Sequence, residues 1–462
     1  MARLADFFSP KDMTVGTPWK RIVEFSIPML IGNIAQQLYS TVDSIVIGRY
    51  VGDNALAAVG SALPVLHFLL VLFVAVSTGA GIMVSQYFGA KDRDRLSRSI
   101  GACITLTAIA SAILMIIGPI VVRPMLVFIN TPESILDWCA DYLLILLVGS
   151  WGFSYFNIFS GILRGLGDSL SALVFLLIST ALNIVLDIWF VAGLNMGVPG
   201  VALATVIAQM VSAVLCAIKL KTMDSVFDFN LNMMKPKKEY LLQLLKLGLP
   251  SGLTQVIFSL AMITVQSLTN TFGEMIIACN VIVMRVDGFA MMPNFTFGMT
   301  MTTYAGQNVG AKKIDRVEQG TRQGLTIAVG VSTVITIIIL IFGRYLMNIF
   351  TDTAELVDLS MRMMRILAVG YIAMAVTQVL SGVMRGAGDT VTPMWLSLIT
   401  TIFLRVPIAY GLAYLTRSAQ YPNGRPESIF VSLLMAWVFG AMITSLFYKK
   451  GKWREKALLK DV

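Results

Sequence analysis

Two aspartates lie inside long apolar segments of the first half of the chain, and they are the first candidates for chemistry. Asp43 follows Asn33, Gln36 and Ser40 at spacings of 3, 4 and 3 residues, which place all four on one face of a helix. A charge at the centre of a membrane helix costs about 2.5–3.5 kcal/mol on insertion scales and usually marks a function.

Two further apolar segments carry similar polar stripes. Thr180, Asn183 and Asp187 are spaced 3 and 4 residues apart, and Thr205 and Gln209 are 4 apart. The simplest arrangement turns the three stripes toward one another around a wet pocket. Polar packing between helices is the alternative, and it suffices for isolated Asn and Thr residues. Two carboxylates without a cationic partner in the same half favour a function instead.

The chemistry that these residues support is cation binding. Two carboxylates in a low-dielectric pocket repel each other, so the pair either takes up a proton or binds Na⁺. Asn183 and Thr205 would complete an oxygen shell around Na⁺. We therefore predict a coupling site formed by Asp43, Asn183, Asp187 and Thr205, which uses H⁺ or Na⁺ and no other cofactor.

Side chains near these stripes are candidates for the lining of a substrate cavity. The chain contains 27 Met residues, which suit an adaptable apolar cavity, although ordinary packing explains any single Met better. The predicted lining residues are Gln36, Tyr39, Asn157, Thr180, Gln209 and Met291. Pro28 lies about four helical turns before Asp43 and predicts a kink, which is either a hinge or a static bend.

The second half offers different groups. Its first helix carries a polar stripe without a carboxylate, formed by Gln255, Ser259, Gln266 and Asn270. Arg285 and Asp287 are two residues apart and do not face each other, so each is expected to pair with another helix. Arg405 precedes Val406-Pro407, and the roles of these three charged residues stay open.

Composition indicates which elements must position these residues. Hydrophobic residues make up 56% of the chain and charged residues 13%, about half the share of soluble domains. Continuous apolar runs such as Ala172–Ala192 and Ile429–Phe447 favour membrane helices over the alternating strands of a barrel. We predict an all-α integral membrane protein with twelve transmembrane helices at about 22–49, 55–88, 99–122, 139–162, 169–192, 198–219, 242–271, 276–308, 321–343, 362–383, 392–415 and 429–448.

The distribution of charge predicts the topology. Lys and Arg residues concentrate at the N-terminus, in the loops after every even-numbered helix and at the C-terminus, which places both termini in the cytoplasm. The net charge of +9 therefore reflects topology and attraction to anionic headgroups rather than nucleic-acid binding. We expect a multi-pass monomer in the cell (inner) membrane. Its partners would be the lipid bilayer and small amphipathic or cationic substrates, with no nucleic acid.

Histidine and cysteine usage excludes a histidine metal cluster and shows no paired cysteine motif. His67 is the only histidine, so a histidine metal cluster is excluded. The cysteines lie in or beside predicted membrane helices without motif spacing, and we interpret them as buried free thiols. They are Cys103, Cys139, Cys216 and Cys279.

The two halves of the chain are repeats. Gln86-Tyr-Phe-Gly-Ala-Lys91 corresponds to Gln307-Asn-Val-Gly-Ala-Lys312, and Ser160-Gly-Ile-Leu-Arg-Gly-Leu-Gly-Asp168 corresponds to Ser381-Gly-Val-Met-Arg-Gly-Ala-Gly-Asp389, both displaced by 221 residues. We predict two pseudo-symmetric six-helix lobes, at 1–220 and 241–462, joined by a cytoplasmic linker at 221–240. Because each half has an even number of helices, both insert the same way up, which is typical of transporters with parallel repeats.

These motifs resemble those of the multidrug and toxin extrusion (MATE) family over essentially the whole chain. The matching features are Val42–Gly48, Ala55–Gly60, Gln86 with Gly89-Ala90, and both Arg-Gly-x-Gly-Asp turns. The resemblance implies a V-shaped pair of lobes that exports amphipathic, often cationic compounds against inward H⁺ or Na⁺. The pattern is most similar to the DNA-damage-inducible branch, in which the cation-binding residues correspond to Asp43, Asn183, Asp187 and Thr205 and the proline that bends the first helix corresponds to Pro28.

Three other function classes compete with multidrug efflux by alternating access. A flippase for lipid-linked oligosaccharide or a related lipid is the main alternative, and it should have a large cavity lined by many Arg and Lys residues. A membrane-embedded enzyme would need a metal cluster or a nucleophile–base pair, so we do not expect an enzyme. A passive channel fits the single buried acidic pocket less well than a carrier does.

Overall fold

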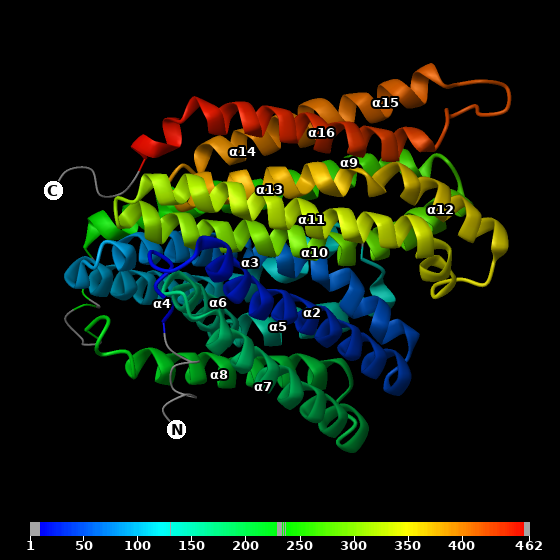
Figure 1. Ribbon diagram of the computed structural model, residues 1–462. Coiled ribbons are helices and arrows are strands. Elements are labelled where there is room, and N and C mark those ends of the chain that lie inside the picture. Colours follow the sequence, from blue (N-terminus) through cyan, green and yellow to red (C-terminus); the bar gives the residue numbers. More distant parts are fainter. Residues whose placement is uncertain (1–9, 130, 229–232, 234, 236, 457–462) are drawn as a thin grey trace. The chain divides into compact units, whose positions relative to one another are not determined.

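Helices account for most of the chain that the structure describes. The computed structural model covers residues 10–129, 131–228, 233, 235 and 237–456, and these residues contain no strand. Figure 1 shows the long helices of each half running alongside one another. Each of the twelve predicted membrane segments is helical, so the prediction of an all-α fold is confirmed.

The chain divides into two compact units. Unit 1 contains Glu24–Gly252 and unit 2 contains Leu253–Val462, and the segment Met13–Val23 belongs to unit 2. The division therefore falls inside two helices, α2 (Pro18–Tyr50) and α9 (Lys238–Asn270). The predicted linker at 221–240 includes residues 229–232, 234 and 236, which lie outside the described residues, so the lobe and linker bounds stay a prediction.

Unit 1 is built around the contacts of α3 with α6 and of α8 with α6 and α7. Its core contains Cys139, Leu143 and Leu147 of α5, packed with Ala58 and Ala62 of α3. The helices are α2 (Pro18–Tyr50), α3 (Asp53–Gly89), α4 (Arg93–Phe128), α5 (Glu133–Val148), α6 (Ser150–Gly165), α7 (Ser169–Asp187), the π-helical turn η1 (Ile188–Gly193), α8 (Gly197–Lys221) and the first part of α9 (Lys238–Asn270).

Unit 2 repeats this arrangement, with α10 packed most extensively on α13, and α16 packed on both α13 and α15. Its core surrounds Tyr371, Met364 and Trp437. The further helices are α10 (Glu274–Gly310), α11 (Ile314–Asn348), α12 (Ala354–Ala368), α13 (Gly370–Gly386), α14 (Val391–Leu398), the π-helical turn η2 (Ile399–Leu404), α15 (Arg405–Leu415), α16 (Glu427–Lys450) and a short 3₁₀ turn, η3 (Lys452–Glu455).

Apolar helix faces are left exposed, as a lipid environment requires. On α4, the side chains of Ile109, Ile113, Ile116 and Ile120 are all exposed and are spaced 4, 3 and 4 residues apart, so they form one stripe. In the described part of the chain, nine helices are long and apolar enough to cross a membrane, or eleven if each of two bent helix pairs counts as one span. The predicted buried free thiols are confirmed for all four cysteines.

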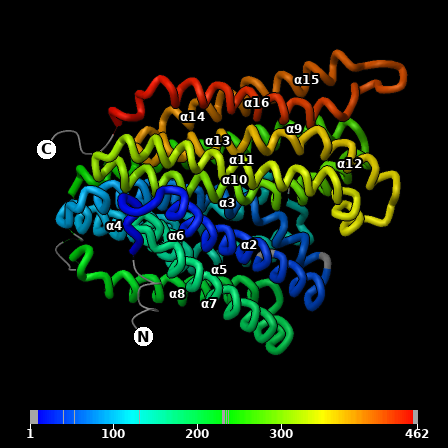
Figure 2. Tube along the Cα trace, viewed as in Figure 1, coloured from blue at the N-terminus to red at the C-terminus, as the bar shows by residue number. Residues whose placement is uncertain are grey.

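Two predicted single helices are broken, which corrects their bounds. The segment predicted at 139–162 consists of α5 and α6 with a bend of 53°, and that at 362–383 consists of α12 and α13 with a bend of 43° (Figure 2). A glycine lies at the first break, Gly149, and directly after the second, Gly370, and another helix passes close to each. A Cβ on Gly149 would lie 2.3 Å from Val206 of α8, and one on Gly370 would lie 2.5 Å from Trp437 of α16.

The backbone confirms the repeat independently of the side chains. Positive φ angles recur at the same displacement of 221 residues, at Gly52 and Gly273, at Lys91 and Lys312, and at Gly167 and Gly388. Lys91 and Lys312 are notable because L-residues rarely adopt this conformation. The turns that end α3 and α10 therefore have one geometry in both halves.

Candidate functional site

The candidate coupling site lies in unit 1, where α2 meets α7. Asn183 and Asp187 of α7 are fully buried, and Asp43 of α2 is half-buried. With its amide nitrogen turned toward the carboxylates, Asn183 donates to Asp43 Oδ1 at 2.9 Å and to Asp187 Oδ2 at 3.1 Å. This orientation is assigned from the hydrogen bonds that it makes possible. One amide thus bridges two carboxylates from different helices.

The second oxygen of Asp187 is left without a partner. Asp187 Oδ1 is buried and accepts no hydrogen bond from any described residue. A buried carboxylate oxygen without a donor is costly, because it has lost its hydrogen bonds to water and no protein hydrogen bond replaces them. When both carboxylates are ionised they also repel each other directly, because the two carboxyl groups lie close enough to share a hydrogen bond when one is protonated. A proton or a cation on the pair relieves both costs, so the geometry suits reversible cation uptake.

Tyr39 and Thr205 form a second polar pair beside these residues. Tyr39 of α2 donates from its hydroxyl to Thr205 Oγ1 of α8 at 3.1 Å. Tyr39 also interacts electrostatically with Asp43 and Asp187, which places this pair next to the carboxylates. Within the described residues, Thr205 makes no hydrogen bond to Asp43, Asn183 or Asp187. The structure therefore brings together three of the four predicted coupling residues directly, and Thr205 through Tyr39.

Tyr142 of α5 belongs to the same neighbourhood, although the sequence did not indicate it. Its buried side chain interacts electrostatically with both Asp43 and Asp187. The polar stripe of α5, formed by Glu133, Asp137 and Asp141, is exposed and does not include Tyr142, so periodicity could not single this residue out. Only the packing of α5 against α3 and α8 brings it to the site.

A cavity opens in unit 1 on the same polar face of α2. It has about 80 Å³ of water-accessible space, which is enough for several water molecules. Three predicted cavity residues, Gln36, Asn157 and Gln209, line it together with Pro28. Gln36 lies two turns before Asp43, about 10 Å along the helix axis. The coupling site and the cavity are therefore neighbours on one helix.

The other predicted cavity residues lie elsewhere. Thr180 is absent from the cavity wall, and its hydroxyl donates to Leu176 of its own helix at 2.9 Å. Tyr39 faces Thr205, as described above. Met291 lies in the hydrophobic core of unit 2, where the amide of Asn294 approaches its sulfur at 3.9 Å. The structure thus gathers three of the six predicted lining residues around one cavity.

Pro28 lies within a continuous helix. α2 runs without a break from Pro18 to Tyr50, although Pro28 cannot donate the backbone hydrogen bond of a normal residue. Its ring forms part of the cavity wall. Any change of helix geometry at this position would therefore alter the cavity directly, and the hinge role stays a prediction.

The charged residues of unit 2 differ in their surroundings. Asp287 is buried, and its Oδ1 accepts a hydrogen bond from Tyr371 of α13 at 3.0 Å, so the expected pairing with another helix is confirmed for this residue. The side chain of Arg285 is exposed, and it forms no ion pair within the described part of the chain. Arg405 is buried and interacts electrostatically with Asp287.

Known proteins with similar sequences cover nearly the whole chain. The probable multidrug resistance protein YoeA of Bacillus subtilis is 29% identical over 429 residues, which is 91% of this chain and 92% of that protein. The probable multidrug resistance protein NorM of Thermotoga maritima is 25% identical, over 95% of this chain and 94% of that protein.

Solved structures agree with this similarity. A structure described as MATE in the straight conformation superposes with a TM-score of 0.89 at 25% identity, covering 97% of this chain and all of the other. One described as MATE in the bent conformation also gives 0.89 at 25% identity, covering 95% of this chain and 97% of the other.

The family comparison reproduces the internal repeat. The family model described as MatE matches residues 28–189 and again residues 250–411, one match in each half. Members of this family are transporters and not enzymes, in agreement with the prediction from the sequence. The repeated match, the fold and the relatives lead to one conclusion: this chain is a membrane transporter of the MATE family.

Proposed function

We infer that the chain is a cation-coupled multidrug antiporter, which exports amphipathic, often cationic compounds by alternating access. The observation that carries this proposal is the amide of Asn183 between the carboxylates of Asp43 and Asp187. It provides a site that gains stability when a cation arrives, on the same helix as a polar cavity. The names of the relatives, which are called multidrug resistance proteins, support the same substrate class.

The coupling step would act through repulsion between α2 and α7. With both carboxylates ionised, only the two hydrogen bonds from Asn183 oppose their repulsion. A proton or Na⁺ on the pair removes the repulsion and lets the two helices pack more closely. Because α2 also carries Gln36 and Pro28 of the cavity, this change in packing would alter substrate binding. If the packing that the cation favours weakens substrate binding, the protein binds either the cation or the substrate at one time, which is the requirement for antiport.

The residues present can serve either cation. For H⁺, the two carboxylates share the proton and the amide nitrogen of Asn183 keeps its two bonds. For Na⁺, rotation of the amide by half a turn presents its oxygen beside carboxylate oxygens, which gives the hard oxygen donors that Na⁺ prefers. The hydroxyls of Tyr39 and Thr205 lie next to this set.

The placement of the protein follows from the same proposal. The concentration of Lys and Arg supports a cell membrane location with both termini in the cytoplasm. Export would then run from the cytoplasm outward. The similarity to the DNA-damage-inducible branch rests on Asp43, Asn183, Asp187 and Thr205, and it belongs to the proposal.

Transport by purified protein in proteoliposomes tests the proposal. A pH gradient and a Na⁺ gradient are imposed separately, and efflux of several cationic dyes is followed. At least one gradient should drive efflux of more than one dye. Equal dye flux with and without either gradient would exclude coupled antiport.

A further inference from the structure

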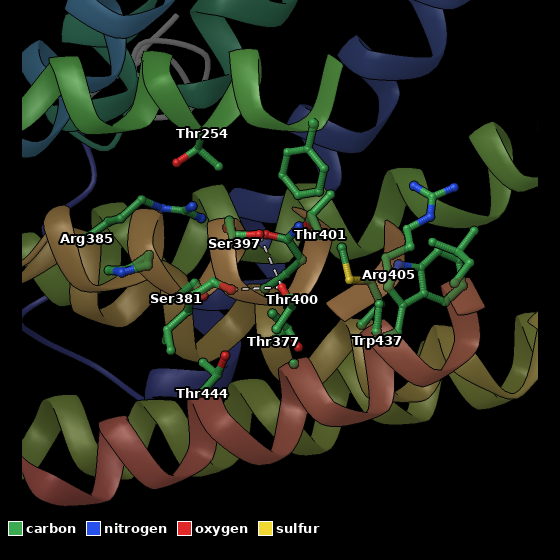
Figure 3. Close-up of a pocket in the computed structure, with 18 residues that line it drawn as sticks. Thr254, Thr377, Ser381, Arg385, Ser397, Thr400, Thr401, Arg405, Trp437 and Thr444 are labelled. Carbon is green, nitrogen blue, oxygen red and sulfur yellow. Dashed lines mark hydrogen bonds between the residues drawn. The ribbon is translucent and has the colours of Figure 1, made fainter. Parts of the chain in front are cut away.

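Unit 2 contains a cavity of its own, and its chemistry differs from that of unit 1. The cavity has about 70 Å³ of water-accessible space between α9, α13, α16 and the segment from α14 to α15 (Figure 3). Its polar lining consists of hydroxyl groups, one amide and two arginines, Arg385 and Arg405. No lining residue of this cavity carries a carboxylate.

Neither arginine forms an ion pair with a residue that the structure describes. The side chain of Arg385 makes neither a hydrogen bond nor an ion pair with any residue that the structure describes. Arg405 is 9% exposed, and its Nε has no hydrogen-bond partner within the described residues. Arg405 is buried without an acceptor for its Nε, which is costly, and Arg385 is half-buried, so an acceptor from outside the chain would be favoured.

Asp287 neutralises Arg405 only in part. It interacts with Arg405 electrostatically, but it is not within ion-pair distance, and its Oδ1 already accepts from Tyr371 at 3.0 Å. Figure 3 shows Arg385 and Arg405 on opposite sides of Ser397 and Thr400. The cavity therefore presents positive charge from two directions.

The first repeat satisfies the arginine that corresponds to Arg385. Arg164, displaced by 221 residues, donates to Ser160 Oγ at 3.0 Å. The corresponding serine, Ser381, lines the unit 2 cavity but does not receive a bond from Arg385. Because Arg385 lacks the hydrogen bond that Arg164 makes to Ser160, its N–H groups can donate to a ligand in the cavity.

The helices that follow the two repeated turns also carry opposite charges. Residues 169–193 contain Asp187 and no Lys or Arg, whereas residues 391–415 contain Arg405 and no Asp or Glu. Both segments contain a π-helical turn, η1 directly after Asp187 and η2 directly before Arg405, and η2 supplies Thr400 and Thr401 to the cavity. Single π-helical turns within membrane helices are frequent at functional sites.

We propose that the cavity of unit 2 binds the anionic group of an amphipathic ligand, a carboxylate, sulfonate or phosphate, between Arg385 and Arg405. Its volume accepts a headgroup rather than a whole drug molecule, and the rings of Phe258 and Trp437 offer an apolar wall to the adjoining part of the ligand. This binding would extend the substrates of the transporter from cations to anions and zwitterions. The role as substrate rests on the proposed antiport, but the binding itself does not.

Three probes with one fluorophore and different charges test the proposal. Dansylglycine is an anion, dansylamide is neutral and dansylcadaverine is a cation. Each is titrated against the purified full-length protein in nanodiscs of phosphatidylcholine without any gradient, and binding is followed by dansyl emission. Dansylglycine should bind saturably and be displaced by benzoate, while benzoate should not displace dansylcadaverine.

Three kinds of variant distinguish the loss of a cavity charge, the filling of the cavity and a non-specific effect on folding. Arg385→Gln should weaken dansylglycine binding about tenfold or more, the order of one lost charge-assisted hydrogen bond, and Arg385→Lys should retain more affinity. Gly440→Leu should also block binding without changing charge. A Cβ on Gly440 meets Thr400 and Thr377 at 3.6–3.8 Å, so the side chain starts in the cavity without a backbone clash. Arg344→Gln, at an exposed arginine paired with Asp358, is the matched control.

The outcomes are distinct. Unchanged dansylglycine affinity in both Arg385→Gln and Gly440→Leu would overturn the proposal, as would displacement of dansylcadaverine by benzoate. If dye efflux fails in proteoliposomes while dansylglycine binding persists, the antiport proposal alone is lost. Repeating the titration with phosphatidylglycerol in the nanodisc distinguishes the source of the anion, because competition by this lipid identifies a lipid headgroup and its absence identifies a soluble anion.

Discussion

Asp43 and Asp187 accept hydrogen bonds from the same amide nitrogen, although they lie on different helices. The arrangement is asymmetric, because Asp187 is fully buried with one oxygen unpartnered and Asp43 is half-buried. Asp43 is therefore the more accessible of the two carboxylates to a cation from solvent. The following predictions use this asymmetry and the contacts around it.

Neutralising either carboxylate should abolish coupled transport without unfolding the protein. Asp43→Asn and Asp187→Asn each remove the group that must gain and lose a cation, and they also remove a buried charge, so stability should not fall. Efflux in proteoliposomes and monodispersity in size-exclusion chromatography measure the two effects. Asp358→Asn, at an exposed carboxylate, is the control. Full gradient-driven efflux by either site variant would contradict the coupling role.

Removal of the bridging amide should lower stability in a pH-dependent way. Asn183→Ala leaves both carboxylates without their shared donor, a loss of about 1–3 kcal/mol for a buried group. The loss should be larger at alkaline pH, where both groups are ionised, than at acidic pH, where a protonated carboxyl can donate to the other. Thermal unfolding across pH measures this. Asn157→Ala is the control, because its amide donates only within its own helix. An equal loss at every pH would exclude the bridge as its cause.

The roles of the Thr205 and Tyr39 hydroxyl groups in the Na⁺ response can be distinguished by single substitutions. If Na⁺ is a coupling ion, Thr205→Val should weaken the response to a Na⁺ gradient more than the response to a pH gradient, because a hydroxyl can bind Na⁺ but is not needed to protonate a carboxylate. Tyr39→Phe removes the same hydrogen bond and leaves the Thr205 hydroxyl in place, so it should have a smaller effect on the Na⁺ response. Equal losses in both variants would assign Thr205 a structural role.

Helix positions could be predicted from the sequence because apolar length and the repeated turns determine them. The bends beside Gly149 and Gly370 could not, because the local sequence does not show that Val206 and Trp437 of other helices lie against these glycines. The same limit applies to the site. Periodicity predicted that Asn183 and Asp187 share a face with one another, but neither the bridge to Asp43 nor the approach of Tyr142 can be obtained from single-helix patterns.

The cavity residues show where pattern analysis loses accuracy. Gln36 and Gln209 were identified as members of polar stripes, and both line the cavity. The prediction of Met291 as a cavity residue rests on residue type alone, and Met291 lies in the core of unit 2. Arg385 belongs to the repeated Arg-Gly-x-Gly-Asp motif in the sequence, and only the fold places it in the wall of a cavity. A prediction from residue type alone is therefore less accurate than one that also uses the helix face on which the residue lies.

The repeated glycines should be intolerant where helices touch. A Cβ on Gly382 of α13 would lie 2.2 Å from the carbonyl oxygen of Gly298 in α10, so Gly382→Ala should destabilise by about 1–3 kcal/mol through overpacking. Gly330→Ala in α11 meets nothing within 4 Å and should be neutral or stabilising, because alanine is the better helix former. Thermal unfolding in detergent compares them. Equal melting temperatures would show that α10 and α13 separate at little cost.

Pro28→Ala should leave the protein folded and inserted but slow its turnover. Restoring the missing backbone hydrogen bond favours a straight α2 by about 3 kcal/mol, the order of the penalty of proline inside a helix, which corresponds to a bias of about a hundredfold. A cation can shift the equilibrium between the two helix conformations only by its differential affinity for them. With the added bias, α2 would stay mostly straight whether or not the cation is bound. Binding of a dye can survive in the favoured state, and loss of efflux with retained binding is the expected result. Pro119→Ala in α4, another proline inside a helix, is the matched control and should transport normally, because Pro119 is exposed and does not line the cavity. Wild-type efflux rates in Pro28→Ala would mean that the bend is static and that α2 does not act as a hinge.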